Sequence, residues 1–172
     1  CLNSSADKEQ MGEGWSDFFA LMLTNTPGYT STTGRGIGTY STNSPTTALG
    51  IRSYRYTTDM TANPFTYADT NTTQGQAHAV GQIWATMLWD LHWKMAEKYG
   101  YNYDITADPN SGSSKALQLV MDGLKLQPCN PNFVSGRDAI LQADQLAGGA
   151  DNCLIWNVFA RRGSGGDASA GT

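Results

Sequence analysis

The sequence has little charge, since only 15% of its 172 residues are Asp, Glu, Lys or Arg, against roughly a quarter in average globular proteins. The 15 acidic and 11 basic residues leave a net charge of -4. No basic field is therefore present to attract a phosphate backbone or an anionic membrane, and we expect no nucleic-acid partner. Gly, Thr, Ser and Asn replace the charged residues. Such surfaces suit extracellular proteins, so we expect a secreted protein.

Long hydrophobic runs are also lacking, and no stretch approaches the roughly 18 apolar residues of a membrane span. The first ten residues, CLNSSADKEQ, have neither the basic nor the apolar region of a signal peptide. We therefore expect no membrane partner, and we expect the chain to begin after any signal peptide. The length favours one domain, which at this size buries roughly 70% of the surface of the unfolded chain.

Cysteine is scarce, and the three residues Cys1, Cys129 and Cys153 make an odd number. Cys129 and Cys153 flank an expected helix and a Gly-rich turn, a hairpin-like path that could bring the two thiols together. The low charge also favours an oxidising compartment. We predict a disulfide between Cys129 and Cys153, with Cys1 unpaired. The alternative is two free thiols, buried or reactive.

Apolar residues recur at helical spacing in five stretches of the chain. These stretches are residues 10–24, 75–99, 113–126, 132–146 and 153–162. The strongest pattern covers 75–99, whose wide apolar stripe predicts the central helix. We expect the tryptophans to be packing residues because their spacing follows that stripe: Trp84, Trp89, Trp93 and Trp156.

Residues 25–74 are dense in Thr, Gly, Asn, Pro and Tyr and lack sustained periodicity. They predict a long irregular segment with at most short strands near 51–56. Irregular segments of this length are usually functional or specially stabilised. The C-terminal GSGGDASAGT is typical of a linker. We expect a mainly α fold with one long irregular loop, a domain over residues 1–163, and a flexible tail or linker over 164–172.

The stretch MGEGWSDFF holds the first candidate functional residues. Glu13 and Asp17 are four apart, so they share one face of the expected helix. Acids near a helix N-terminus complement its dipole, which is the ordinary explanation. However, Gly12 and Gly14 each cost about 1 kcal/mol inside a helix, which indicates close backbone approach or a bound group. A carboxylate can ligate a metal while a second acid one turn on orients another ligand.

Five blocks of the sequence lie in one order along the chain: MGEGWSDFFA, GIRSYRYTTDMTANPFTYAD, QAHAVGQIWATMLWDLHW, LQPCNPNFVSGRDAILQAD and NVFARRG. Together these blocks resemble fungalysin zinc metallopeptidases. The resemblance covers residues 1–163 and implies the helical C-terminal subdomain of a thermolysin-like metallopeptidase. It further implies a secreted zinc endopeptidase that hydrolyses peptide bonds of protein or peptide substrates by zinc-activated water.

In that family two histidines of an H-E-x-x-H helix and a downstream glutamate hold the zinc. The resemblance implies that Glu13 is this downstream ligand and that Asp17 supports it. The sequence departs from the family because it contains no H-E-x-x-H, and its only histidines are His78 and His92. We expect that helix upstream of Cys1, as a partner half of the catalytic domain. This chain alone is therefore expected to bind no zinc and to be inactive.

Two further residues have counterparts in the family. His78 opens the central helix, where a lone histidine is ordinarily a capping or core residue. The resemblance implies instead that it donates a hydrogen bond to the oxyanion of the tetrahedral intermediate, with Asp69 as a candidate acid beside it. Arg52, ordinarily a surface arginine, resembles one that binds a substrate carbonyl. His92, four turns beyond His78, is expected to be structural.

These assignments predict one open cleft. Summed ligand distances place the Glu13 carboxylate within about 7 Å of the His78 ring, with Arg52 loosely held at the same mouth. We expect Trp15, Phe18 or Met22 to anchor the helix that carries Glu13. Tyr54 and Tyr56 receive no role. The competing function is a non-catalytic binding or structural domain derived from a metallopeptidase.

Overall fold

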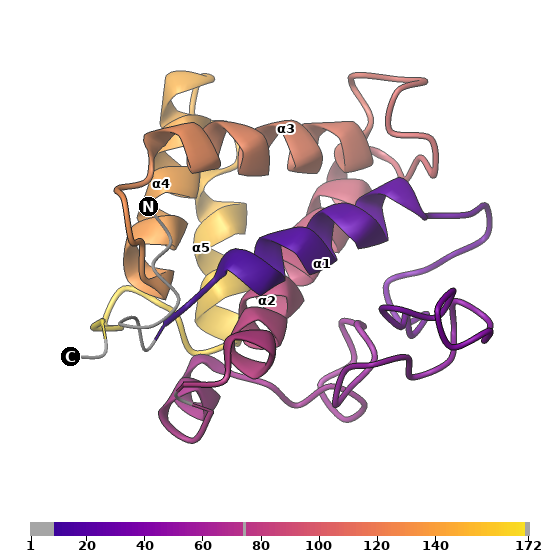
Figure 1. Ribbon diagram of the computed structural model, residues 1–172. Coiled ribbons are helices and arrows are strands. Elements are labelled where there is room, and N and C mark those ends of the chain that lie inside the picture. The colour runs from indigo at the N-terminus through magenta and orange to yellow at the C-terminus, as the bar shows by residue number, and fades with distance from the viewer. Residues whose placement is uncertain (1–8, 74, 171–172) are drawn as a thin grey trace.

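The computed structural model describes residues 9–73 and 75–170, and within these ranges the chain is mainly helical, without strands (Figure 1). Its elements, in order, are α1 (Gly12–Leu23), the 3-10 helix η1 (Tyr67–Asn71), α2 (Ala77–Tyr99), α3 (Gly112–Leu126), α4 (Phe133–Leu146) and α5 (Asn152–Arg161). Each of the five α-helices expected from periodicity is present, with ends that differ by at most two residues. The mainly α fold class is confirmed.

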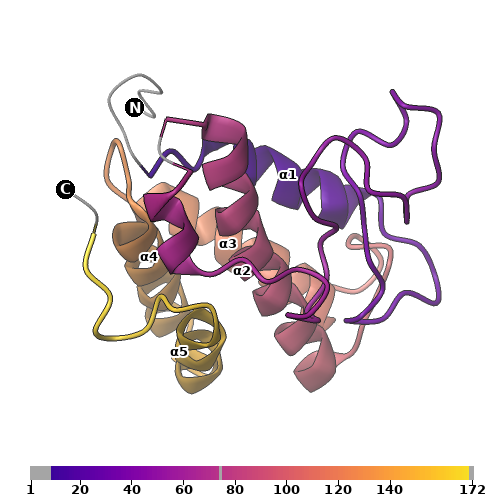
Figure 2. The ribbon, with the colours of Figure 1, turned by 90° about the horizontal axis from the view of Figure 1, so that it is seen from below.

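Helix α2 lies at the centre and contacts α1, α3, α5 and η1 (Figures 1 and 2). It is buried around most of its circumference from Val80 to Trp93, which is broader than the stripe that periodicity indicated. Trp84 and Trp89 are fully buried, and the indole of Trp84 meets the indole of Trp15 edge to face at 5.2 Å. Burial on this scale makes α2 the scaffold on which the other helices are positioned.

Helices α1 and α2 approach each other through glycine. A Cβ on Gly14 would lie 2.3 Å from the carbonyl oxygen of Gly81, and a Cβ on Gly81 would lie 2.5 Å from the backbone nitrogen of Gly14. Close backbone approach therefore accounts for the costly glycine at position 14. The predicted anchoring of α1 is confirmed, because Trp15, Phe18 and Met22 are all buried in the core.

The long segment between α1 and η1 is irregular, as expected. Residues 51–56 form no strand, and the segment contains only two isolated bridges, Arg35 with Tyr56 and Ile37 with Gly50. Hydrogen bonds from side chains, and not a β-ladder, fix the path of this segment. The buried Arg35 donates to the Asn25 side chain at 2.9 Å and to the carbonyl oxygen of residue 24 at 3.1 Å. The loop thus has a fixed path despite its lack of regular structure.

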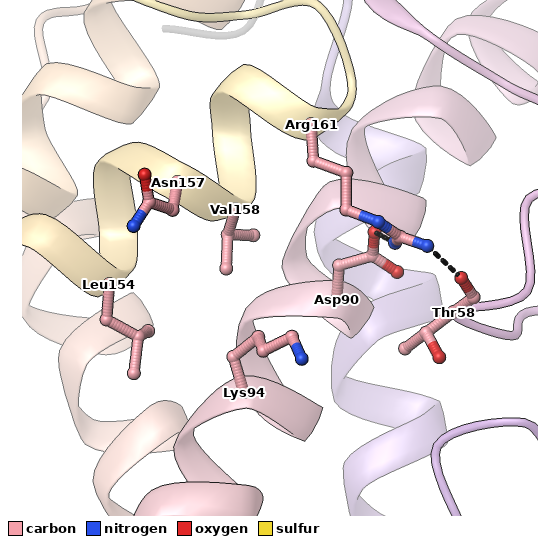
Figure 3. A pocket seen from close by; sticks show the side chains of 7 residues that line it. All are labelled: Thr58, Asp90, Lys94, Leu154, Asn157, Val158 and Arg161. Atoms are coloured by element: carbon pink, nitrogen blue, oxygen red, sulfur yellow. Dashed lines mark hydrogen bonds and ion pairs between the residues drawn. The ribbon is translucent and has the colours of Figure 1, made fainter.

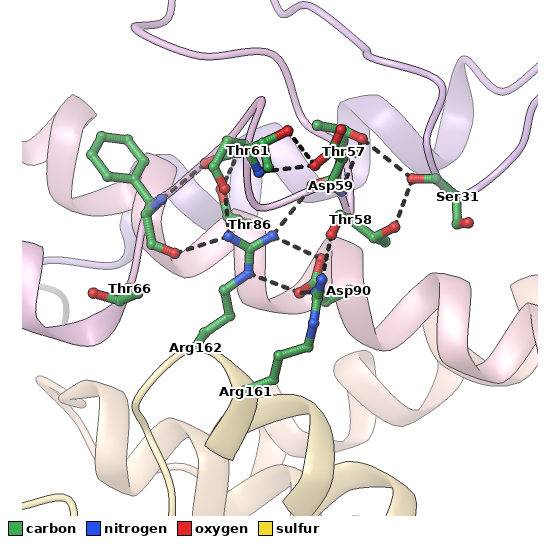
Figure 4. A network of polar contacts seen from close by, with 12 residues as sticks. Ser31, Thr57, Thr58, Asp59, Thr61, Thr66, Thr86, Asp90, Arg161 and Arg162 are labelled. Carbon is green, nitrogen blue, oxygen red and sulfur yellow. Dashed lines mark hydrogen bonds and ion pairs between the residues drawn. The ribbon is translucent and has the colours of Figure 1, made fainter.

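A charged cluster connects α5 to α2 and to the long segment (Figure 4). Arg162 is fully buried and binds Asp90 of α2 through Nε at 2.8 Å and through Nη2 at 3.2 Å. Its Nη1 donates to the carbonyl oxygens of Asn63 and Phe65. Arg161 adds a 2.7 Å contact to Asp90. Burial raises the pKa of the Asp90 carboxyl against the lowering effect of Arg162.

The predicted disulfide between Cys129 and Cys153 is wrong. Cys129 is disulfide-bonded, whereas Cys153 is a free, exposed thiol. The physical reason is the length of α4, whose 14 residues span roughly 21 Å. Cys129 precedes the first turn of that helix and Cys153 follows its last, so the two thiols lie far beyond the roughly 7 Å between Cα atoms that a disulfide allows. The prediction for Cys1 falls outside the described residues.

Residues 164–170, which the sequence assigns to a tail, contact the helical body. Ser164 is fully buried, and its carbonyl oxygen accepts from Arg137 Nη1 at 3.1 Å. The Tyr67 hydroxyl donates to the carbonyl oxygen of Ser169 at 3.0 Å. In the part of the chain that the structure describes, no helix is both long enough and apolar enough to cross a bilayer.

Candidate functional site

Glu13 and His78 meet where α1 and α2 begin. Each is the second residue of its helix, and Glu13 Oε2 lies 3.3 Å from His78 Nε2. This meets the expected limit of about 7 Å. The Glu13 side chain is 40% exposed and the His78 side chain 70%, so both are open to solvent. The contact follows from the helix crossing, because Gly81, one turn after His78, packs on Gly14 beside Glu13.

Asp17 and Arg52 form a buried ion pair behind this contact. Arg52 Nε donates to Asp17 Oδ2 at 2.7 Å, and Arg52 Nη2 donates to Asp17 Oδ1 at 2.8 Å. The same Nη2 lies 3.4 Å from Glu13 Oε2. Hydrogen bonding to Asp17 raises the pKa of the guanidinium well above its ordinary value. The expectation that Arg52 is loosely held is wrong, because its side chain is only 7% exposed and bound in two places.

Tyr56 completes the polar cluster, although sequence reasoning gave it no role. It is fully buried, and its hydroxyl donates to Asp17 Oδ2. Burial, followed by the charge of Asp17, raises the pKa of the phenol well above 10, so the hydroxyl remains a donor. The sequence offered no signal for this role, because residues 51–56 have no regular structure that would fix which side chains meet.

Asp69 does not lie beside His78 as a partner. Its Oδ2 accepts from the Thr66 backbone nitrogen at 2.7 Å and from the Thr66 hydroxyl at 2.9 Å, which caps η1. Glu13 is the acid in contact with His78. The sequence pointed to the wrong carboxylate because the two helix starts are distant along the chain.

An open cavity of about 520 Å³ adjoins His78. It is lined by Ile51, Arg52, Ser53, Gly75, Gln76, Ala77, His78, Ala79 and Gln82. Gln82 is buried and fixes the loop wall, since its Oε1 accepts from the Ser53 backbone nitrogen and its Nε2 donates to the Tyr54 carbonyl oxygen. One wall of the cavity is therefore the start of α2, and the other is the loop that carries Arg52.

The donor set tests whether these residues suit a metal ion. The polar contacts of Glu13 all use Oε2, and Oε1 has no polar partner among the described residues. A half-exposed carboxylate with a free oxygen suits a single metal ligand. Within residues 9–73 and 75–170, however, no group of three or more His, Cys, Asp or Glu side chains could hold an ion. The described residues therefore fit one ligand position of a zinc site.

His92 lies outside the site, and its structural interpretation is confirmed. It is fully buried, and its Nε2 lies 3.1 Å from the Ser113 hydroxyl of α3. Burial, with a smaller effect of Arg35, lowers the pKa of the imidazole to about 3. The ring is consequently neutral in the folded protein at physiological pH.

A second cavity of about 450 Å³ opens between α2 and α5 (Figure 3). It is lined by Thr58, Asp90, Lys94, Leu154, Asn157, Val158 and Arg161. Asp90 lies twelve residues after His78 on α2, which corresponds to roughly 18 Å along the helix axis. Asp90 and Arg161 already pair with each other. This cavity is therefore separate from the carboxylate–histidine site.

Together these features describe a helical unit in which two helices begin side by side. Their first turns place a solvent-facing carboxylate and histidine over a buried ion pair. Carboxylate and imidazole groups are both common metal ligands in proteins. The chain belongs to the fungalysin metallopeptidase family (M36), whose profile matches residues 1–168.

Three curated relatives illustrate the similarity. Extracellular metalloproteinase MEP of Pyricularia oryzae is 45% identical over 98% of this chain and 27% of its own length. Extracellular metalloproteinase 3 of Trichophyton tonsurans is 43% identical over 96% of this chain and 26% of its own length. The protein of the same name in Trichophyton soudanense is 42% identical over 96% of this chain and 42% of its own length. The chain thus spans between about a quarter and two fifths of these relatives.

Proposed function

We propose that this chain is the C-terminal part of the catalytic region of a secreted zinc endopeptidase, with protein or peptide substrates. The contact between Glu13 and His78 carries the proposal, because it joins a half-exposed carboxylate to a solvent-facing histidine. The family match and the names of the extracellular relatives support it. The two zinc histidines and the general-base glutamate are proposed to come from an upstream H-E-x-x-H helix of the complete protein.

Each residue of the cluster has a distinct proposed role. Glu13 provides one ligand to zinc, which when bound acts as a Lewis acid and activates water for attack on the peptide carbonyl. His78 donates a hydrogen bond toward the oxygen that gains charge as the carbonyl becomes tetrahedral. Such a donor must lie near the metal ligand, and the 3.3 Å separation meets this requirement.

Asp17 and Arg52 are proposed to position these groups. Asp17 lies one turn after Glu13 and anchors Arg52 through two hydrogen bonds, which leaves one lone pair on Oδ1 for a histidine N–H from the partner half. Arg52 borders the cavity beside His78 and is proposed to bind a substrate carbonyl there. Its planar fork is held rigidly, which reduces the entropy lost when a substrate binds.

The test is made on the complete protein that contains this chain. Glu13→Gln should lose zinc, measured by elemental analysis, and should lose peptidase activity with it. His78→Ala should retain zinc and lose roughly 10²- to 10³-fold in kcat, as expected for removal of one oxyanion donor.

Glu97→Gln is the matched control, because Glu97 is an exposed glutamate of α2 whose one ion pair among the described residues is with Lys94. It should keep both the metal and the activity. A Glu13→Gln protein with full zinc content, or a His78→Ala protein with full kcat, contradicts the proposed roles. Zinc-free, inactive wild-type protein favours the binding or structural domain instead.

A further inference from the structure

Asn71, Thr72 and Thr73 form the acceptor triplet of N-linked glycosylation, in which an asparagine is followed by any residue except proline and then by Ser or Thr. The sequence contains a second such triplet at Asn3, outside the described residues. The triplet alone carries little weight, because an acceptor asparagine must also be accessible. Whether Asn71 is accessible depends on the residues around it.

The Asn71 side chain is presented to solvent. Asn71 is the last residue of η1, and both it and Thr72 are exposed. Among the described residues its amide has no hydrogen-bond partner. In contrast, Asn63 is fully buried and donates to the Arg55 carbonyl oxygen and to Thr86. The free amide of Asn71 is therefore available as a nucleophile.

The segment around Asn71 is short and locally held. Thr72 and Thr73 each donate a side-chain hydrogen bond to the carbonyl oxygen of Asp69 at 3.0 Å. These bonds involve only residues within four positions, so the triplet can open without disturbing the core. An acceptor segment must adopt an extended path in the transferase, and this one can do so at low cost.

We propose that Asn71 carries an N-linked glycan, an inference that rests on the proposed secretion of the protein. The Asn71 amide nitrogen bonds to the anomeric carbon of an oligosaccharide carried on a polyprenyl pyrophosphate. The bond from that carbon to the pyrophosphate oxygen breaks, the pyrophosphate leaves on its lipid, and the amide loses one proton.

The acceptor asparagine is close to the candidate site along the chain. Gly75 lines the cavity beside His78 and follows Asn71 by four residues, which span at most about 14 Å of chain. A bulky, hydrated oligosaccharide on Asn71 would therefore be attached within that length of chain from the cavity.

The experiment expresses the complete protein through the secretory pathway of a fungal host. Peptide-N-glycosidase digestion in heavy-oxygen water converts a glycosylated asparagine to a labelled aspartate, which mass spectrometry assigns by peptide. The peptide containing Asn71 should be labelled in the wild type. Asn71→Gln and Thr73→Ala should abolish the label at this peptide.

Two conservative variants separate glycosylation from folding effects. Thr73→Ser keeps the acceptor hydroxyl and Thr72→Ala changes only the variable position, so both should retain the label. An unlabelled Asn71 peptide in secreted wild-type protein, with a host glycoprotein labelled in the same sample, overturns the proposal. This readout is independent of zinc content and peptidase activity, so its failure is distinguishable from failure of the proposed function.

Discussion

Asp17 receives three hydrogen bonds from two residues of the long segment, and no backbone ladder contributes to this anchorage. Arg52 supplies two of them and Tyr56 the third. All three side chains are largely buried. At the scale of single residues, one carboxylate therefore ties two positions of the irregular segment to α1, and removal of either donor residue should be measurable.

Tyr56→Phe deletes only the hydroxyl and leaves Asp17 with one donor fewer. Because hydrogen bonds to charged groups contribute about 1.5–3 kcal/mol, we expect the free energy of unfolding to fall by a similar amount. Urea denaturation measures this change. Tyr40→Phe is the matched control, since Tyr40 is 98% exposed and should alter stability by less than about 0.5 kcal/mol. Equal effects of the two substitutions would contradict the assigned role of Tyr56.

His92 makes stability depend on pH. Burial lowers its folded pKa to about 3, whereas in the unfolded chain the pKa is about 6.5. Below pH 6.5 the unfolded state binds a proton that the folded state does not, so stability falls as the pH falls. The slope from this residue should approach about 1.4 kcal/mol per pH unit between pH 6 and pH 4. Urea denaturation at several pH values should show this slope in the wild type and lose it in His92→Gln, where an unchanged slope would refute the assignment.

At the scale of elements, the close contact between α1 and α2 predicts that Gly81 cannot be replaced without a loss of stability. An added Cβ would lie 2.5 Å from the Gly14 nitrogen and 2.8 Å from the Glu13 Cβ, so the helices must separate. We expect Gly81→Ala to destabilise by about 1–3 kcal/mol, despite the better helix propensity of alanine.

Gly12→Ala is the control for that substitution, because a Cβ at position 12 meets only the flexible end of the Gln10 side chain. It should leave stability within about 1 kcal/mol of the wild type in thermal unfolding. If both variants unfold at the wild-type temperature, close backbone approach is not what holds the two helices.

The helices themselves were predictable because periodicity reports burial directly. Trp84 and its neighbours on α2 were expected in the core and lie there. The loop that carries Arg52 was not predictable, because its path depends on side-chain contacts such as Gln82 to Tyr54 that leave no periodic trace. The wrong disulfide prediction for Cys129 and Cys153 has a similar origin, because it did not account for the length of the rigid helix α4 between them.

The candidate site was also predictable only in part. Gly14 signalled close backbone approach in the sequence, but its partner Gly81 emerged only from the helix crossing. The resemblance to fungalysins predicted that Glu13 and His78 lie close together, and in the structure Glu13 Oε2 and His78 Nε2 are 3.3 Å apart. It provided no role for Tyr56, since a buried tyrosine in a polar loop is most often a packing residue.

At the scale of the whole molecule, the described residues lack a complete ligand set. A zinc site needs at least three protein ligands, and Glu13 with His78 cannot provide them. We expect the isolated 172-residue chain to hold less than stoichiometric zinc after dialysis and to leave casein intact. Elemental analysis and a casein digestion assay measure both, with the complete protein as the positive control. Tight one-to-one zinc with chelator-sensitive casein cleavage by the isolated chain would contradict this expectation.

The glycine contact between α1 and α2 bears on how such a chain can diverge over generations. Because Gly14 meets Gly81 backbone to backbone, the spacing of the two helix starts is sensitive to any side chain added at either position. A Cβ at one glycine would meet the backbone of the other, so changing both residues would force the helices further apart than changing one. The contact between Glu13 and His78 therefore constrains two residues that have no functional group of their own.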